Sequence, residues 1–426
     1  MKELQQASST VPKRKVWQDL YLVIKGYAIA KNYSNTIIAL SIAIKYHNGQ
    51  TRKDGTPYII HPLTIAMFLI NLRVDDDITL AAAILHDVIE DNHFEDNGEH
   101  LVTEFGLDQD VLKIVRLLSK DPNYKVTDPT EEKYYHGIAT DIRAIMIKIA
   151  DRTDNVSTID VFTPEKMKSY VSETKTLVYP LFKQKELHPK YSNAITITKY
   201  LIVSLCEVTE SILGIKTPNI DPQKYKKTFA FIKGYARGKN MPNTSRALYV
   251  AEKLHEGQTR SSGDPFIIHP LRVCSYLISL RITDDVTCAA AILHEVFKKC
   301  DIQRDSDILE KEYHIDPEVV KLIKIVSKPD DMDKATYYDI LKKDPRALLT
   351  KLSNRANTCT ILTSYTQEEI DEYVAESKEY IYPLCSYGLF NYPEYSESID
   401  IMNYHIYSIC RLVSSLTHLK PELKTS

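Results

Sequence analysis

Four ionisable residues stand together in the apolar stretch "AAAILHDVIEDN": His86, Asp87, Glu90 and Asp91. On a helix, Glu90 lies one turn after His86, and Asp91 lies one turn after Asp87, so the side chains form a compact polar patch. The apolar residues around this patch predict that its charges are partly removed from water and need a partner. A divalent metal ion is the simplest partner for imidazole and carboxylate groups.

A second helix and an isolated histidine offer further groups to the same site. The segment "IRAIMIKIADRTDNVSTI" places Asp151, Asn155 and Thr158 on one helical face. His61 precedes Pro62, and proline is favoured in the first turn of a helix, so this histidine is expected at a helix entrance. Each feature alone is more often structural, as a core histidine, a solvated helix end or an ion pair. Their joint occurrence, in the order H…HD…D, favours a metal site.

The chain contains two copies of one sequence unit. "HNGQTRKDGTPYIIHPL" recurs as "HEGQTRSSGDPFIIHPL" at an offset of 208 residues, which falls to 203 and then 204 later in the copies. We therefore expect tandem domains, since each copy has a normal domain size. The predicted segments are an N-terminal extension (1–20), a first domain (21–214), a linker (215–227), a degenerate second domain (228–420) and a tail (421–426).

Both copies are predicted to be all-α. Apolar residues recur at three- and four-residue spacing with little alternation, and 426 residues with 43% hydrophobic content can form two cores. A loop precedes His61, and Asp54-Gly55 predicts a turn within it, so a short hairpin fits there.

The bulk composition predicts a cytoplasmic protein that binds neither nucleic acid nor membrane. The formal net charge is −3, with 54 basic and 57 acidic residues, which gives no basic field for a polyanion. No segment has the apolar length of a membrane span, and the first residues lack the apolar core of a signal peptide. The seven scattered cysteines suit reduced thiols.

Three segments of the first copy closely resemble the hydrolase domain of the Rel/Spo alarmone enzymes, within the HD phosphohydrolase superfamily: "HNGQTRKDGTPYIIHP", "LAAAILHDVIED" and "IKIADRTDN". The resemblance covers about residues 25–185. It implies a helical, Mn²⁺-dependent enzyme that removes the 3′-pyrophosphate from ppGpp and pppGpp. It implies that Mn²⁺ is held by His61, His86, Asp87 and Asp151. It further implies that water is positioned and activated by Glu90 and Asp91, and that the guanosine polyphosphate is bound by Arg52, Lys53, Asn155 and Thr158.

Residue chemistry agrees with this assignment but leaves alternatives open. A mixed nitrogen and oxygen ligand set suits Mn²⁺ or Fe²⁺, and spacing alone does not exclude zinc. Glu90 is the expected base for the attacking water. Asp54 and Asn92 depart from the family's usual serine or threonine at these positions. The substrate could therefore be another phosphorylated nucleotide, such as an adenosine alarmone or the 2′-phosphate of NADPH, and a non-catalytic nucleotide-binding regulator is a further alternative. No synthetase domain is expected.

The second copy keeps His269 and His294 but loses the other groups. Glu295 replaces Asp87, and the acidic pair and the last ligand are replaced by Lys298, Lys299 and Asn354. Protonated lysines would repel a metal ion and cannot act as a base, which predicts a catalytically inactive copy. Two roles are open for it: packing against the first copy, or binding an anionic nucleotide as a regulatory site.

Overall fold

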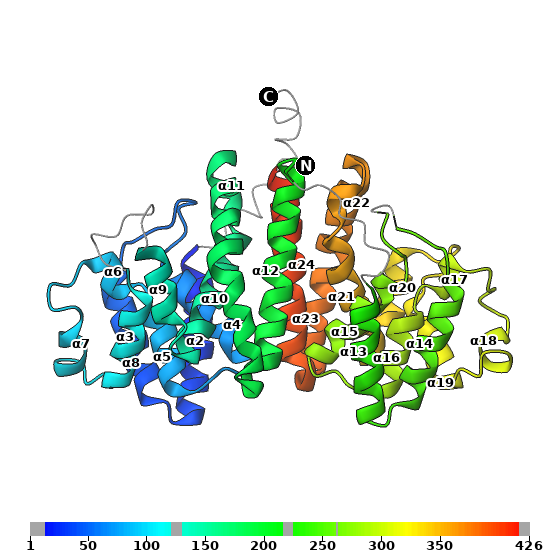
Figure 1. Cartoon of the computed structure of the whole chain (residues 1–426), viewed down its shortest axis with the longest axis horizontal. Helices are drawn as coiled ribbons and strands as arrows, with labels where there is room; N and C mark the ends of the chain where they lie inside the picture. Colours follow the sequence, from blue (N-terminus) through cyan, green and yellow to red (C-terminus); the bar gives the residue numbers. More distant parts are fainter. Residues whose placement is uncertain (1–12, 121–129, 216–224, 261–262, 417–426) are drawn as a thin grey trace. The chain divides into compact units, whose positions relative to one another are not determined.

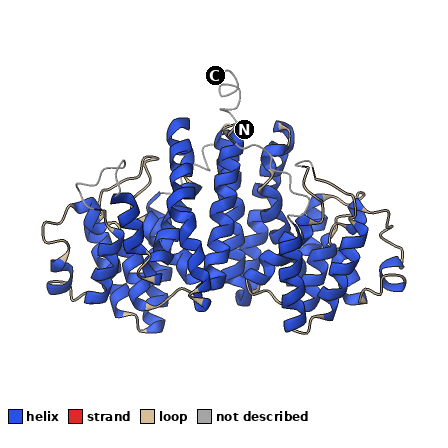
Figure 2. Cartoon of the chain, in the orientation of Figure 1, coloured by secondary structure: helices blue, strands red, loops and turns tan. Residues whose placement is uncertain are grey.

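The computed structural model describes residues 13–120, 130–215, 225–260 and 263–416. Helices and short connections account for these residues, and the described ranges contain no strand (Figure 2). The all-α prediction is therefore confirmed. The chain divides into a first unit, Met1–Ile202, and a second unit, Val203–Ser426. Most of the predicted linker and all of the predicted tail lie outside the described residues, so the predicted domain limits stay predictions.

The first unit consists of short and medium helices, coloured blue to green in Figure 1. Its α-helices are α2 (Lys13–Lys31), α3 (Ser34–Tyr46), α4 (Ile60–Asn71), α5 (Asp77–Leu85), α6 (Val88–Asn92), α7 (Glu99–Thr103), α8 (Gln109–Leu118), α9 (Thr130–Ile138), α10 (Ile142–Ser157) and α11 (Pro164–Glu173). Single turns and irregular helices follow as η1 (Ile159–Val161), η2 (Thr174–Val178), η3 (Tyr179–Glu186) and η4 (Pro189–Tyr191). Helix α12 (Ser192–Ile212) begins in this unit and ends in the next.

The second unit repeats the same order of elements, from green to red in Figure 1. Its α-helices are α13 (Tyr225–Gly238), α14 (Pro242–Leu254), α15 (Ile268–Ser279), α16 (Asp285–Leu293), α17 (Val296–Lys299), α18 (Ile308–Lys311), α19 (Pro317–Val326), α20 (Lys334–Leu341), α21 (Pro345–Cys359), α22 (Gln367–Glu376), α23 (Tyr382–Asn391) and α24 (Ser396–Leu416). Its irregular helices are η5 (Leu362–Ser364), η6 (Ser377–Ile381) and η7 (Pro393–Tyr395). None of the described helices combines the length and apolar character needed to cross a membrane.

Helices α3, α4, α5 and α10 pack together in the first unit and bury their apolar faces. Asp77 fixes the start of α3 against α5, because its carboxylate accepts hydrogen bonds from the backbone N–H groups of Asn35 (3.0 Å) and Thr36 (2.8 Å). These are donors that a helix start leaves unsatisfied. Asp285 does the same in the second unit for the N–H groups of Asn243 (2.9 Å) and Thr244 (2.8 Å). One carboxylate thus positions two helices in each unit.

The loop before His61 is a tight turn closed by one antiparallel bridge, Thr51 to Pro57, so the expected hairpin is reduced to a single bridge. The backbone N–H of Arg52 donates to the Thr56 carbonyl at 2.8 Å, and Gly55 has a φ of 78°. Glycine tolerates this left-handed conformation without steric cost. The turn leads directly into α4, which begins at Ile60 and so confirms the expected helix entrance at His61.

A π-helical turn occurs at the same place in both units, as η2 and η6. The segment that follows begins with Tyr-Pro in each unit but differs in its winding. In the first unit it is the 3₁₀ helix η3 of 8 residues, and in the second it is the α-helix α23 of 10 residues. Both segments precede a long final helix, α12 or α24.

Candidate metal centre

The four predicted ligands come from three places in the first unit. His61 lies in the first turn of α4, and Asp151 lies within α10. His86 and Asp87 lie between α5 and α6, where the helix is interrupted, so the continuous helix assumed for the HDVIED segment is wrong. Both residues keep near-helical backbone angles, with Asp87 at φ −101° and ψ −7°, so the interruption is a local opening of one turn.

The structure brings the donor atoms of these residues together. His86 Nε2 lies 2.9 Å from Asp87 Oδ2, and His61 Nε2 lies 3.3 Å from Asp151 Oδ1. His61 Nε2 is also 3.7 Å from Asp87 Oδ2, and His86 Nε2 is 3.9 Å from Asp151 Oδ1. His61, His86 and Asp151 each offer a ligand atom, and these atoms lie within 4.8 Å of one another. Two imidazoles and two carboxylates therefore face a common point.

The hydrogen bonds of the histidines orient their free nitrogens toward that point. His61 Nδ1 lies 2.7 Å from Asp154 Oδ2, and His86 Nδ1 lies 2.9 Å from the Ala83 carbonyl. Both partners accept, so each Nδ1 donates, and Nε2 of a neutral ring carries a lone pair. His86 Nε2 is buried and makes no hydrogen bond among the described residues, although a carboxylate oxygen lies beside it. Two acceptors at this distance need a shared cation, so the residues fit a metal ion.

The electrostatics of the cluster also call for positive charge. Burial disfavours ionised groups, but Lys148 and the two histidines hold the pKa of Asp151 well below its ordinary value. Burial likewise opposes protonation of His61, yet hydrogen bonds to Asp151 and Asp154 raise the pKa of its imidazole to about 9. The ionised carboxylates thus favour a positive charge at this point, which either a proton on His61 or a metal ion can supply.

Three residues of the site were missed by sequence reasoning. Asp154 accepts from both His61 and Arg52, whose Nη1 lies 2.9 Å from Asp154 Oδ2. Lys148 Nζ lies 2.9 Å from Asp151 Oδ2, and the Tyr58 hydroxyl donates to Asp87 Oδ2 at 2.6 Å. Helical spacing could have found Lys148, since it lies three residues before Asp151 on α10 and pairs with it.

The acidic pair lies at the exposed edge of the cluster. Glu90 turns toward the start of the loop after α8, where its carboxylate accepts from the Lys120 N–H at 3.0 Å. The Asp91 carboxylate interacts electrostatically with Asp87, one of the predicted metal ligands. Shielding from water and the Asp87 carboxylate raise the pKa of Asp91 to about 6.

Two of the predicted nucleotide-binding residues join the cluster and two lie at its border. Arg52 Nη2 donates to Asn155 Oδ1 at 2.8 Å, and Asn155 Nδ2 donates to Asp151 Oδ1 at 2.5 Å. Thr158 follows the last residue of α10, and its hydroxyl donates to the Asp154 carbonyl at 3.2 Å. Lys53 is exposed, with Nζ 4.8 Å from the centre of the Phe162 ring.

The two positions that depart from the family pattern make local contacts. Asp54 Oδ1 accepts from the Thr56 N–H at 2.9 Å and from the Thr56 hydroxyl at 2.6 Å. Asn92 donates from Nδ2 to the Val88 carbonyl at 2.9 Å, within its own helix. Both side chains therefore stabilise a turn or a helix end.

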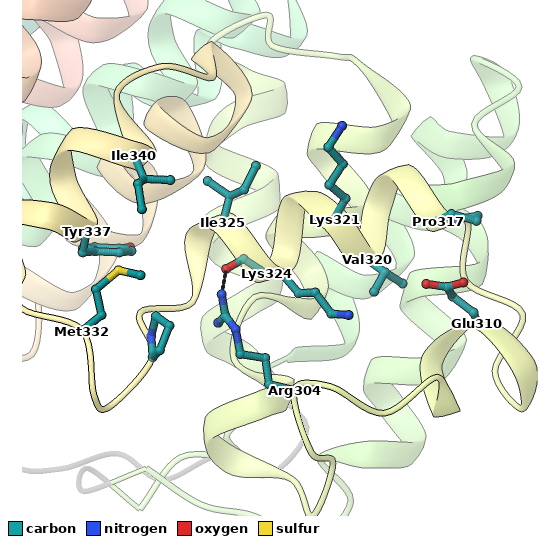
Figure 3. Close-up of a pocket in the computed structure, with 11 residues that line it drawn as sticks. Arg304, Glu310, Pro317, Val320, Lys321, Lys324, Ile325, Met332, Tyr337 and Ile340 are labelled. Atoms are coloured by element: carbon teal, nitrogen blue, oxygen red, sulfur yellow. Dashed lines mark hydrogen bonds between the residues drawn. The ribbon is translucent and has the colours of Figure 1, made fainter.

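A separate cavity of about 450 Å³ lies on α19 and α20 of the second unit (Figure 3). Its lining is largely apolar and includes Val320, Ile325 and Ile340. The Arg304 guanidinium within it donates to the main-chain carbonyls of Lys324 and Ser327. The cavity has no histidine and only one carboxylate, Glu310, so it does not carry a metal site.

Both copies of the chain match a known protein family, and two similar proteins share one described activity. The family model described as the HD domain matches residues 39–186 and again 247–384. A guanosine-3′,5′-bis(diphosphate) 3′-pyrophosphohydrolase of Vibrio cholerae is 39% identical over 153 residues, which are 34% of this chain and 21% of that protein. One of the same name from Aquifex aeolicus is 39% identical over 146 residues, 34% of this chain and 20% of its own.

A third relative is the bifunctional (p)ppGpp synthase/hydrolase SpoT of Escherichia coli, 33% identical over 179 residues, which are 41% of this chain and 25% of SpoT. The match therefore spans about a fifth to a quarter of the length of these relatives. Among solved structures, a metazoan orthologue of SpoT aligns with 40% of this chain and 94% of its own, at 21% identity and a TM-score of 0.32.

Proposed function

The chain belongs to the HD-domain family, in the RelA/SpoT branch of ppGpp hydrolases, and from this premise we propose that its first unit is a (p)ppGpp 3′-pyrophosphohydrolase. The observation that carries the proposal is that the imidazole nitrogens of two histidines and the oxygens of two carboxylates lie close together, on His61, His86, Asp87 and Asp151. The proposed products are GDP or GTP and pyrophosphate.

The metal ion would be held by His61, His86, Asp87 and Asp151, and Mn²⁺ is proposed from the family resemblance. A divalent cation bound there neutralises phosphoryl charge and makes water more acidic. In the overall reaction, water attacks the phosphorus nearest the ribose, the bond to the 3′ oxygen breaks, and that oxygen takes up a proton. The residues of the chain must therefore bind a polyanion, orient water and accept its proton.

Asp91 is the best-supported base for this water, although the sequence favoured Glu90. Burial and the neighbouring Asp87 carboxylate raise the pKa of Asp91, which favours this carboxylate as a proton acceptor. Glu90 is held by the Lys120 N–H and is proposed to orient water beside it. Arg52 carries fixed positive charge next to the ligands, where a guanidinium can grip phosphate oxygens, and Asn155 holds Arg52 in place.

The test measures Mn²⁺-dependent release of pyrophosphate from ppGpp by the full chain. We expect Asp151→Asn and Asp91→Asn each to lower kcat by about 10²- to 10⁴-fold, the range for a lost catalytic group. Glu90→Gln should cost less than Asp91→Asn. Asp110→Asn, on the exposed surface of α8, serves as the matched control. Full activity in Asp151→Asn would contradict the proposed centre.

Parallel assays separate the alternatives. An adenosine alarmone is tested for release of pyrophosphate, and NADPH is tested for release of orthophosphate from its 2′ position. Product from either of these, without product from ppGpp, would move the proposal to another phosphorylated nucleotide. Binding of ppGpp with no product from any nucleotide would instead favour a non-catalytic regulator.

A further inference from the structure

We propose that the second unit holds its own divalent metal ion on His269, His294 and Glu295, beside a cationic rim that binds a phosphate-bearing anion without cleaving it. This site lies outside the proposed hydrolytic centre, and its existence does not depend on the activity of the first unit. It also differs from the sequence-based expectation that the lysines of this copy exclude a metal.

The two histidines of the second unit are oriented as ligands. His269 Nδ1 lies 2.7 Å from Asn357 Oδ1, and His294 Nδ1 lies 2.8 Å from the Ala291 carbonyl. Both oxygens accept, so the Nδ1 atoms donate and the Nε2 atoms carry lone pairs. The ring centroids are 5.1 Å apart, against 5.2 Å for the corresponding pair in the first unit. The ligand geometry thus survives although the acidic residues around it have changed.

Glu295 completes a three-residue ligand set. One ligand atom from each of His269, His294 and Glu295 lies within 4.8 Å of the others, and Glu295 Oε1 is 3.4 Å from His294 Nε2. His294 is only 2% exposed, and its Nε2 makes no hydrogen bond among the described residues. Two imidazoles and one carboxylate form a set that Zn²⁺, Mn²⁺ or Fe²⁺ accepts with positions left open.

A cavity of about 570 Å³ opens onto this set. His269 and Glu295 line it together with Arg260 and Lys299. Lys298 and Lys299 are both exposed, so water screens their repulsion of a buried cation. Lys299 lines the cavity beside the ligand set.

The charges around this cavity select an anion as the additional ligand. The first unit surrounds its centre with Asp87, Asp91 and Asp151, whereas the second unit keeps only Glu295 among the matching positions. One carboxylate leaves a divalent cation with a net positive charge, which an anion can neutralise. Arg260 and Lys299 add donors suited to phosphate oxygens. Since Lys299 stands where Asp91 would accept a proton, a bound phosphate ester or diphosphate is not hydrolysed.

The first test counts metal ions on the full, metal-stripped chain by calorimetric titration with Mn²⁺. We expect two equivalents in the natural chain and one in Glu295→Gln, which keeps the side-chain shape, as well as in His294→Ala. His86→Ala should remove the other equivalent, and His136→Ala, at an exposed position of α9, should remove none.

The outcomes distinguish the two sites. A single equivalent that survives Glu295→Gln and His294→Ala would overturn the second-unit site. A single equivalent that is lost in these variants would support it and would instead count against the metal centre of the proposed hydrolase.

The second test adds inorganic pyrophosphate to His86→Ala, in which only the second-unit site takes metal. We expect pyrophosphate to tighten Mn²⁺ binding by about tenfold or more, a coupling of ordinary size. Lys299→Ala should lose this tightening and keep the metal. Unchanged Mn²⁺ affinity, or release of orthophosphate from the added pyrophosphate, would overturn the binding role.

Discussion

Asp154 and Asn357 occupy matching positions and accept the same hydrogen bond, 2.7 Å from the Nδ1 of His61 and of His269. They differ in charge. Asp154 also pairs with Arg52, so one carboxylate orients a proposed metal ligand and holds a proposed phosphate-binding group. Partners of this kind fix the ring orientation and raise the basicity of a ligating histidine. An amide preserves the orientation alone.

Asp154→Asn should therefore separate these effects. We expect the His61 hydrogen bond to persist while the Arg52 ion pair is lost, so metal affinity falls by about tenfold and the KM for nucleotide rises. Asp154→Ala should weaken metal binding further, by up to about 100-fold. Competition titration with a metal chelator measures the first quantity and initial-rate kinetics the second. Equal metal affinity in all three proteins would show that Asp154 does not act through His61.

At the scale of elements, Asp77 and Asp285 tie the start of one helix to another in their units. Asp77→Ala leaves the N–H groups of Asn35 and Thr36 without this acceptor, so we expect the unfolding free energy to fall by about 1–3 kcal/mol. Asp285→Ala is the matched change in the other unit and should cost a similar amount. Denaturant unfolding at neutral pH measures both. A loss below about 0.5 kcal/mol in either variant would contradict this role.

The sequence predicted the elements better than their interruptions. Pro62 correctly placed the start of α4, and helical spacing correctly placed α10, where a long apolar periodicity dominates. The opening at His86 and Asp87 carries no glycine or proline and departs only slightly from helical angles, so no local signal marks it.

The contacts of the site could be predicted only in part. Asp151 and Asn155 share a helical face as predicted, and their side chains are hydrogen-bonded. The role of Asp154 depends on tertiary packing, which brings α4 and the Arg52 turn to the same carboxylate. Spacing along one helix contains no information about such partners.

At the scale of the whole molecule, one buried histidine should make stability depend on pH. His405 on α24 is fully buried, and burial lowers the pKa of its imidazole to about 3. The unfolded chain binds a proton there below about pH 6.5, while the folded chain does not, so stability falls as the pH drops through that value. The expected loss is about 2 kcal/mol at pH 5.

His405→Leu tests this, since Leu201 is the buried residue at the matching position of the first copy. We expect the variant to lose less stability than the natural chain between pH 7.5 and pH 5, as measured by denaturant unfolding at several pH values. His136→Gln, at an exposed histidine, should leave the pH dependence unchanged. An identical pH slope in His405→Leu would rule out His405 as the titrating group.

The unequal windings of η3 and α23 show how the two copies accommodate a difference in chain length. At a rise of about 2.0 Å per residue, the 8 residues of η3 extend about 16 Å, and at about 1.5 Å per residue the 10 residues of α23 extend about 15 Å. The two segments therefore have nearly equal lengths, and the stretches from Tyr179 to Tyr191 and from Tyr382 to Tyr395 contain 13 and 14 residues. A change between 3₁₀ and α-helical winding can therefore compensate for a short insertion or deletion at this position, so that the long helix that follows is not displaced.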